Sequence, residues 1–152
     1  MKRSKRLKLI KEIISSKKIS SQGDLLNELI KKGYNITQST ISRDLNYLRV
    51  AKVRNYLGEE YYTIDKGSYE GKFIDPGKFK SKFNESVISV KRANNIIVVK
   101  TFAGEAQGTA AVIDGMNFIE ILGTVAGDDT VICVINSSAD AEKVLNLMQE
   151  QF

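Results

Sequence analysis

The segment Thr37-Gln38-Ser39-Thr40-Ile41-Ser42-Arg43-Asp44-Leu45 predicts a capped amphipathic helix in the first half of the chain. Thr37 is a favourable N-cap, because its hydroxyl can accept a hydrogen bond from a backbone N–H of the first turn. A helix over residues 38–49 then has an apolar face for the core. That face consists of Ile41, Leu45 and Leu48, and a second face consists of Ser39, Ser42, Arg43 and Asn46.

The second face of this helix has side chains suited to the major groove of DNA. Arg43 could donate two hydrogen bonds to guanine, and Asn46 could pair with adenine. Serine and threonine residues near the helix start, such as Ser39, suit phosphate contacts supported by the helix dipole. The alternative is an ordinary solvated face of a three-helix domain.

The flanking segments predict a winged helix-turn-helix. Upstream, residues 5–16 have the spacing of an amphipathic helix. A second helix is capped at Ser20-Ser21 and ends at Gly33, which suits the position after a helix C-terminus. Downstream, residues 51–56 and 60–64 read as two strands joined by a glycine turn. This hairpin would be the wing, and its Lys52 and Arg54 are candidates for contacts with the DNA backbone or minor groove.

Charge divides the chain into two unlike halves. The 152 residues carry a net charge of +5, but residues 1–82 hold 19 basic and 9 acidic residues, which gives +10. Residues 83–152 hold 4 basic and 9 acidic residues, which gives −5. A basic domain is expected for a protein that neutralises nucleic-acid phosphates, although lysines can also simply keep a small domain soluble. We therefore expect two domains with different partners.

The composition argues against several classes of protein. The chain has no histidine and one cysteine, so it cannot form an internal disulfide or a histidine-dependent catalytic or metal site. Cys133 lies in an apolar stretch and is expected to fill a core. Neither a signal peptide nor a membrane span is apparent, and we expect a cytoplasmic protein that is not an enzyme and has no metal site.

The second half predicts an α+β domain in the order ββαββα. The strands are expected at 86–91, 96–101, 119–125 and 130–135, and the helices at 104–116 and 138–151. The predicted organisation is a DNA-binding domain at 1–66, a linker at 67–82 and a second domain at 83–152. Helices on one face of an antiparallel sheet leave the other face open, and oligomerisation could cover it.

An acidic pair, Asp128-Asp129, lies in the turn between the last two predicted strands. The pair has three interpretations: turn chemistry, a hard-metal site, or recognition of a cationic ligand such as a guanidinium. From the pair alone, turn chemistry is favoured. Gln107 and Asp114 are seven residues apart on one predicted helix face, where a solvated surface is the simpler interpretation.

Two motifs resemble those of the bacterial arginine repressor family. The segment at 37–45 resembles the family's helix signature, and Leu122-Gly123-Thr124-Val125-Ala126-Gly127-Asp128-Asp129-Thr130 is similar to its second signature. The Ala-Gln at 106–107 and the later Asp114 are similar too. The resemblance covers essentially the whole chain.

The resemblance implies a transcriptional regulator that binds palindromic operator DNA through the winged helix-turn-helix. L-arginine would be the corepressor, and no other cofactor is expected. Such a protein represses arginine biosynthesis and activates arginine catabolism. The second domain would form a trimer and two trimers a homohexamer, with arginine bound between them. The alternative is a divergent member with a weak arginine response or none, or an architectural DNA-binding accessory factor.

The motif match also implies roles for individual residues. Ser42 and Arg43 are the strongest DNA-contact candidates, followed by Gln38 and Ser39. Asp128 and Asp129 match the acidic pair that binds arginine, and Gln107, Asp114, Thr124 and Ala126 match positions around it. Two residues depart from the family pattern. Arg49 stands where glycine is common, and Phe102-Ala103 precedes Gly104 where proline is common.

Overall fold

The computed structural model describes residues 1–55, 57–64 and 76–150. The chain divides into two compact units, one within Met1–Lys72 and the other within Phe73–Phe152. None of the helices in the described parts of the chain is both long and apolar enough to cross a membrane. Each unit has its own secondary structure and core, so each is described separately.

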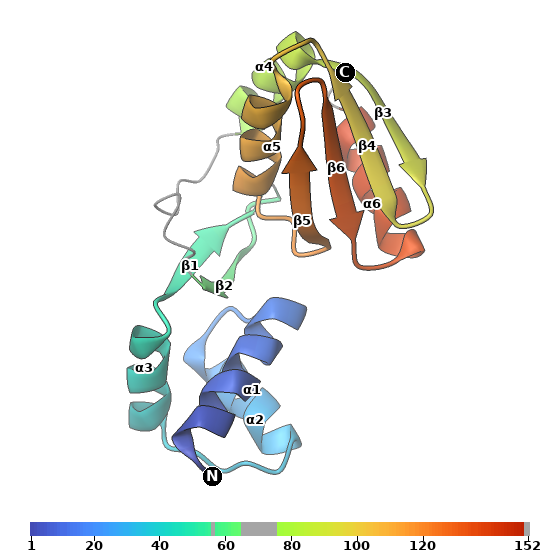
Figure 1. Ribbon diagram of the computed structural model, residues 1–152. Helices are drawn as coiled ribbons and strands as arrows, with labels where there is room; N and C mark the ends of the chain where they lie inside the picture. The colour runs from blue at the N-terminus through green and yellow to red at the C-terminus, as the bar shows by residue number, and fades with distance from the viewer. Residues whose placement is uncertain (56, 65–75, 151–152) are drawn as a thin grey trace. The chain divides into compact units, whose positions relative to one another are not determined.

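The first unit contains three helices and a hairpin, as the sequence predicts (Figure 1). The helices are α1 (Arg3–Ser16), α2 (Gln22–Lys31) and α3 (Gln38–Tyr47). Ser21 accepts a hydrogen bond from the Asp24 N–H, and Thr37 accepts one from the Thr40 N–H, which confirms both predicted caps. Gly33 has a φ of 83°, the left-handed conformation expected after a helix.

The core of this unit is formed by one apolar stripe from each helix. Its fully buried members include Ile10, Leu25, Leu29 and Ile41. The hairpin consists of β1 (Val50–Arg54) and β2 (Glu60–Ile64), which pair antiparallel with Lys52 opposite Tyr62. The Tyr62 N–H also donates to the carbonyl of Ile19, which joins the hairpin to the segment between α1 and α2. These contacts complete the predicted winged helix-turn-helix.

The second unit is built on a four-stranded antiparallel sheet in the order β3-β4-β6-β5. Its strands are β3 (Val87–Ala93), β4 (Ile96–Thr101), β5 (Ile121–Ala126) and β6 (Thr130–Ile135). The helices α5 (Ala106–Gly115) and α6 (Ser138–Gln149) pack on β4 and β6, and α6 lies behind the sheet in Figure 1. Residue 151, where the last helix was expected to end, lies outside the described residues.

Side chains alternate in direction along β4 and β6, the two central strands, so the sheet has one buried face and one exposed face. Ile97 and Val99 of β4, and Val131, Cys133 and Ile135 of β6, are buried beneath the helices. Ile132 and Val134 point the other way and are 41% and 37% exposed, and Val125 of β5 is 69% exposed. The predicted α+β arrangement with one uncovered apolar sheet face is therefore present.

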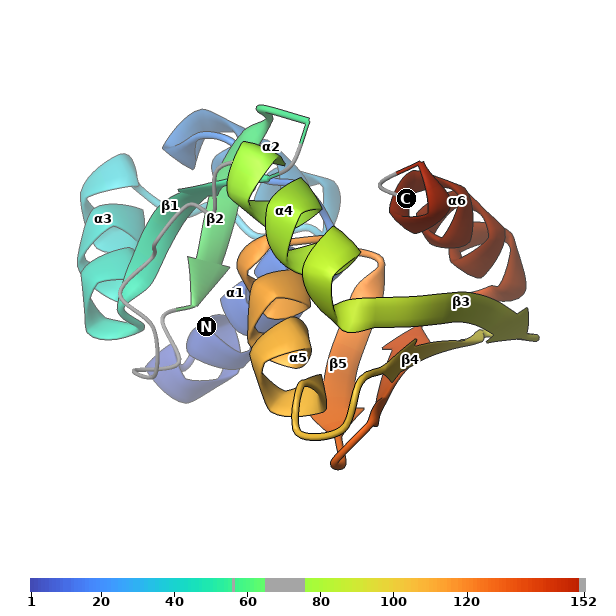
Figure 2. The ribbon, with the colours of Figure 1, turned by 90° about the horizontal axis from the view of Figure 1, so that it is seen from above.

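An additional helix, α4 (Pro76–Ser86), corrects the predicted linker at 67–82. In Figure 2, α4 leads directly into β3 and lies on the side of the sheet where α6 also lies. Phe79 and Phe83 are one helical turn apart, are 1% and 0% exposed, and have ring centroids separated by 5.0 Å. Burial of these two rings stabilises a helix where glycine and lysine suggested a linker. Residues 67–75 of the predicted linker lie outside the described residues.

Candidate functional site

The polar face of α3 is accessible, as a DNA-reading face must be. Gln38, Ser39, Arg43 and Asn46 are exposed, and Ser42 is half-buried. Arg43 forms no ion pair with the described residues, so its guanidinium retains all of its donors for a partner. The structure thus presents together the five helix residues that the sequence predicts for DNA contact.

Sequence reasoning missed Asp44, a buried carboxylate on the opposite side of α3. Asp44 is 2% exposed and accepts hydrogen bonds from the Nε and one terminal nitrogen of Arg6 on α1. The hydrogen bond to Asp44 raises the pKa of Arg6, and Arg3 lies 4.0 Å from the same carboxylate. Arg3 also lies over the ring of Tyr47, 4.4 Å from its centroid. These interactions join α1 to α3.

Arg49 has a φ of 53°, in the left-handed region that favours glycine. It follows the end of α3, and its N–H donates to the carbonyl of Asn46. The departure from the glycine expected at this position therefore has a structural consequence. The backbone is strained at Arg49, where the chain turns into β1. The Arg49 side chain adds an exposed positive charge beside the predicted DNA-reading face.

The cations of the wing have an acidic neighbour. Arg54 contacts Glu60 at 2.8 Å, and Lys52 lies 4.0 Å from the same carboxylate. The hydrogen bond from Arg54 lowers the pKa of Glu60. Both cations remain about half exposed, so phosphates can compete with Glu60 for them. Lys52 and Arg54 are therefore accessible to DNA, but Glu60 offsets part of their positive charge.

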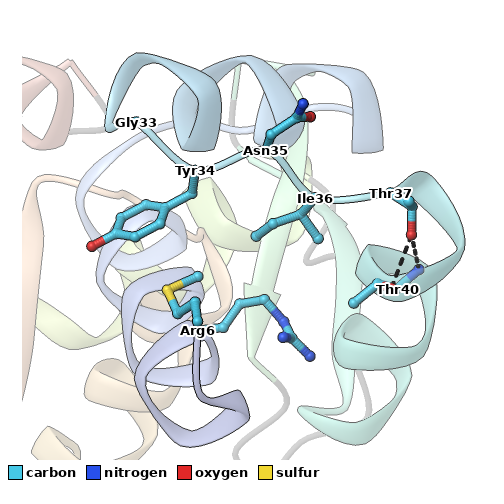
Figure 3. A pocket seen from close by; sticks show the side chains of 8 residues that line it. Arg6, Gly33, Tyr34, Asn35, Ile36, Thr37 and Thr40 are labelled. Carbon is cyan, nitrogen blue, oxygen red and sulfur yellow. Dashed lines mark hydrogen bonds between the residues drawn. The ribbon is translucent and has the colours of Figure 1, made fainter.

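A hollow of about 470 Å³ lies in the first unit beside the turn between α2 and α3. It is lined by residues 33–37 together with Met1, Arg6 and Thr40. Figure 3 shows Arg6 extending from α1 toward the side of α3. None of the residues predicted to bind arginine contributes to this hollow.

In the second unit, α5 and β5 are joined by two side-chain hydrogen bonds. Gln107 donates through Nε2 to the carbonyl of Ala126 at 3.0 Å. Seven residues along the same helix, Asp114 accepts a hydrogen bond from the Thr124 hydroxyl at 2.8 Å. Four of the six residues predicted for arginine contact therefore lie along one edge of this unit.

Backbone hydrogen bonds fix the acidic turn at the end of that edge. The carbonyl of Asp128 accepts from the N–H groups of Gly104 and Ala106, and the carbonyl of Asp129 accepts from that of Thr101. Both residues are exposed, so their carboxylates are accessible at the surface of the turn. The turn thus brings the other two predicted residues to the N-terminal end of α5.

The two carboxylates have different surroundings. Asp129 accepts from the Thr130 hydroxyl at 2.8 Å and lies 3.4 Å from Lys100 Nζ. These neighbours, Thr130 first, lower the pKa of Asp129. The carboxylate of Asp128 forms no hydrogen bond or ion pair with the described residues. Among those residues, no group of three or more Cys, Asp or Glu side chains is placed to hold a metal ion.

An ion pair and a buried cysteine are further ionisable features of this unit. Lys82 of α4 contacts Glu105 at 2.8 Å and thereby lowers the pKa of that carboxyl, joining α4 to the start of α5. Cys133 is fully buried, and burial followed by the charge of Asp114 raises its thiol pKa to about 12. The thiol is therefore inert at neutral pH, as expected for a core residue.

Comparison with known proteins identifies close relatives of both units. Residues 1–68 match the family described as "Arginine repressor, DNA binding domain", and residues 83–150 match "Arginine repressor, C-terminal domain". A protein of Caldicellulosiruptor saccharolyticus named arginine repressor is 40% identical over 94% of this chain and 92% of its own length. Proteins of the same name from Bacteroides thetaiotaomicron and Thermotoga maritima are 40% and 39% identical. They cover 97% and 94% of this chain, and 94% and 93% of their own lengths.

Proposed function

Because the chain belongs to the arginine repressor family, a family of DNA-binding transcriptional regulators, we propose that L-arginine is its corepressor. In this proposal it represses the genes of arginine biosynthesis and activates those of arginine catabolism. The family regulates transcription rather than catalysing a reaction, and it combines a DNA-binding domain with an arginine-binding C-terminal domain. The sequence expectation of a regulator rather than an enzyme is thus confirmed.

The first unit would bind palindromic operator DNA. We propose that Arg43 and Asn46 read base edges, and that Gln38, Ser39 and Ser42 contact the backbone near the start of α3. Lys52 and Arg54 would contact the adjacent backbone or minor groove. The exposure of the polar face of α3 supports the assignment of the helix residues, as does the absence of ion pairs between Arg43 and the other described residues.

The second unit would bind L-arginine along the edge of α5 and β5. The observation that carries this proposal is the convergence of six residues from two separate segments, α5 and the stretch from β5 into the following turn. The carboxylates of Asp128 and Asp129 would recognise the cationic groups of the ligand, because a carboxylate pairs well with a guanidinium. Gln107, Asp114, Thr124 and Ala126 would form the adjoining wall.

Oligomerisation gives arginine a route to control DNA binding. The open apolar face of the sheet would be covered in a trimer, and two trimers would form a hexamer with arginine between them. Carboxylates brought together in such an assembly repel one another, and arginine relieves that repulsion. Ligand binding therefore stabilises the assembled form, in which several DNA-binding units act together.

Fluorescence anisotropy of a labelled palindromic operator duplex tests this proposal. At fixed physiological salt, millimolar L-arginine should tighten binding by the full-length protein, and L-lysine should not. Tight binding that ignores arginine would reject the corepressor role and favour a divergent regulator or an architectural factor. Absence of operator binding under both conditions would also reject the assignment of α3.

A further inference from the structure

Lys100 contacts both Asp129, one of the two acidic residues of the turn, and its neighbour Thr130. It lies on β4 directly opposite Thr130 of β6. Its ammonium group is 2.7 Å from the Thr130 hydroxyl and 3.4 Å from Oδ2 of Asp129. The Thr130 hydroxyl in turn donates to Oδ1 of Asp129. Both oxygens of Asp129 are therefore engaged by neighbours within the same unit.

The carboxylate of the adjacent residue, Asp128, has different surroundings. Asp128 is exposed, and its carbonyl is held by the N–H groups of Gly104 and Ala106. Its carboxylate has no ionic or hydrogen-bonding partner among the described residues. Two adjacent aspartates thus differ in charge balance, since Lys100 offsets Asp129 while no cation of the described segments pairs with Asp128.

We propose that Lys100 is an internal cation that competes with arginine for Asp129, leaving Asp128 as the principal carboxylate for the ligand's cationic group. This inference rests on the arginine-binding role proposed above and adds a residue that sets the affinity. A bound arginine that uses Asp129 must displace Lys100 from this carboxylate. Breaking the Lys100–Asp129 contact costs part of the binding free energy, so Lys100 weakens arginine binding.

The size of the effect follows from the exposure of the pair. Lys100 and Asp129 have side chains that are 45% and 54% exposed, so water and salt screen their interaction. Removing the charge of Lys100 should tighten arginine binding by about two- to fivefold, the range expected for one partly screened charge contact. Removing the charge of Asp128 should weaken binding by more than removing that of Asp129.

Isothermal titration of the full-length protein with L-arginine tests the competition. Lys100→Gln should bind arginine about two- to fivefold more tightly, and Lys100→Arg should resemble the unaltered chain. In an Asp129→Asn background, Lys100→Gln should change affinity by less than about twofold, because its target is gone. Lys143→Gln is the matched control, since it removes a cation paired with Glu120 on the same unit, and it should leave affinity unchanged.

The outcomes separate the two proposals. If the unaltered chain binds arginine but Lys100→Gln weakens or leaves binding unchanged, the role of Lys100 is rejected and the corepressor site stands. Equal tightening with and without Asp129, or in Lys143→Gln, would also reject competition at Asp129. If neither the unaltered chain nor Lys100→Gln binds arginine, both proposals fail. Circular dichroism melts of each variant show whether the fold is retained.

Discussion

Arg6 and Asp44 join the first and third helices of the DNA-binding unit across 38 positions of sequence. The Arg6 guanidinium donates two hydrogen bonds to a carboxylate that is 2% exposed. The pair therefore fixes the inner side of α3 while its outer side presents Arg43 and Asn46. A helix that reads base edges must be held in a defined orientation, and this pair is placed to do so.

Replacing Asp44 by Asn should destabilise the first unit by about 1–3 kcal/mol, the cost of breaking charge-assisted hydrogen bonds at a buried site. The amide nitrogen of Asn cannot accept from Arg6, so one donor of the guanidinium is left without its acceptor. Chemical denaturation followed by circular dichroism measures the change. Lys8→Gln, at an exposed position of the same unit, should have almost no effect. Equal stability of Asp44→Asn and the unaltered chain would show that the pair contributes nothing.

Replacing Arg49 by Gly should stabilise the chain by about 1 kcal/mol or less. Glycine relieves the strain at a φ of 53°, although its greater freedom in the unfolded chain offsets part of the gain. Arg49→Ala removes the same charge but keeps the strain, so it should bring no comparable stabilisation. Both variants should weaken operator binding similarly, because both lose one cation. A stability gain in the Ala variant equal to that in the Gly variant would contradict the strain argument.

The lowered pKa of Glu28 predicts how the stability of the fold depends on pH. Hydrogen bonds from Lys17 first and then Lys31 lower the pKa of Glu28 from its ordinary 4.5 to about 2. Because the folded-state pKa is the lower one, ionised Glu28 stabilises the fold above pH 4.5, and this contribution disappears as the pH falls through about 2. The Tm difference between the unaltered chain and Glu28→Gln should therefore be largest near neutrality and shrink in acid. A constant difference over that range would refute the assignment.

Cys133 should resist thiol reagents in the native protein. It is fully buried, and its pKa of about 12 leaves almost no thiolate in mildly alkaline buffer. Reaction with Ellman's reagent should be negligible in the folded chain and complete in denaturant. Rapid labelling of the folded chain, at the rate of a small-molecule thiol, would show that β6 is more accessible than its burial indicates.

The sequence predicts the elements whose signals are local. The caps at Ser21 and Thr37 follow from hydroxyl chemistry, and Gly33 from the need for a left-handed residue. The helix α4 was missed because Lys80, Lys82 and nearby glycines obscured the one-turn spacing of Phe79 and Phe83. That spacing is the signal that could have identified the helix.

The contacts that tune the sites could not be predicted in the same way. The pairing of Arg6 with Asp44 and of Lys100 with Asp129 depends on how distant segments pack, and periodicity carries no such information. Spacing alone favoured a solvated face for Gln107 and Asp114, and both residues are indeed exposed. The structure adds a hydrogen-bonded neighbour on β5 for each of them. Their contact with arginine, like that of Arg43 with DNA, remains a prediction.

The most direct test of the account is operator binding by the unaltered chain, Arg43→Ala and Asp128→Asn, each measured by anisotropy with and without millimolar L-arginine. We expect Arg43→Ala to lose specific binding in both conditions, because it removes the main base-reading donor. Asp128→Asn should keep the arginine-independent affinity and lose most of the tightening by arginine. An intact arginine response in Asp128→Asn, or unaltered specific binding by Arg43→Ala, would contradict the division of labour between the two units.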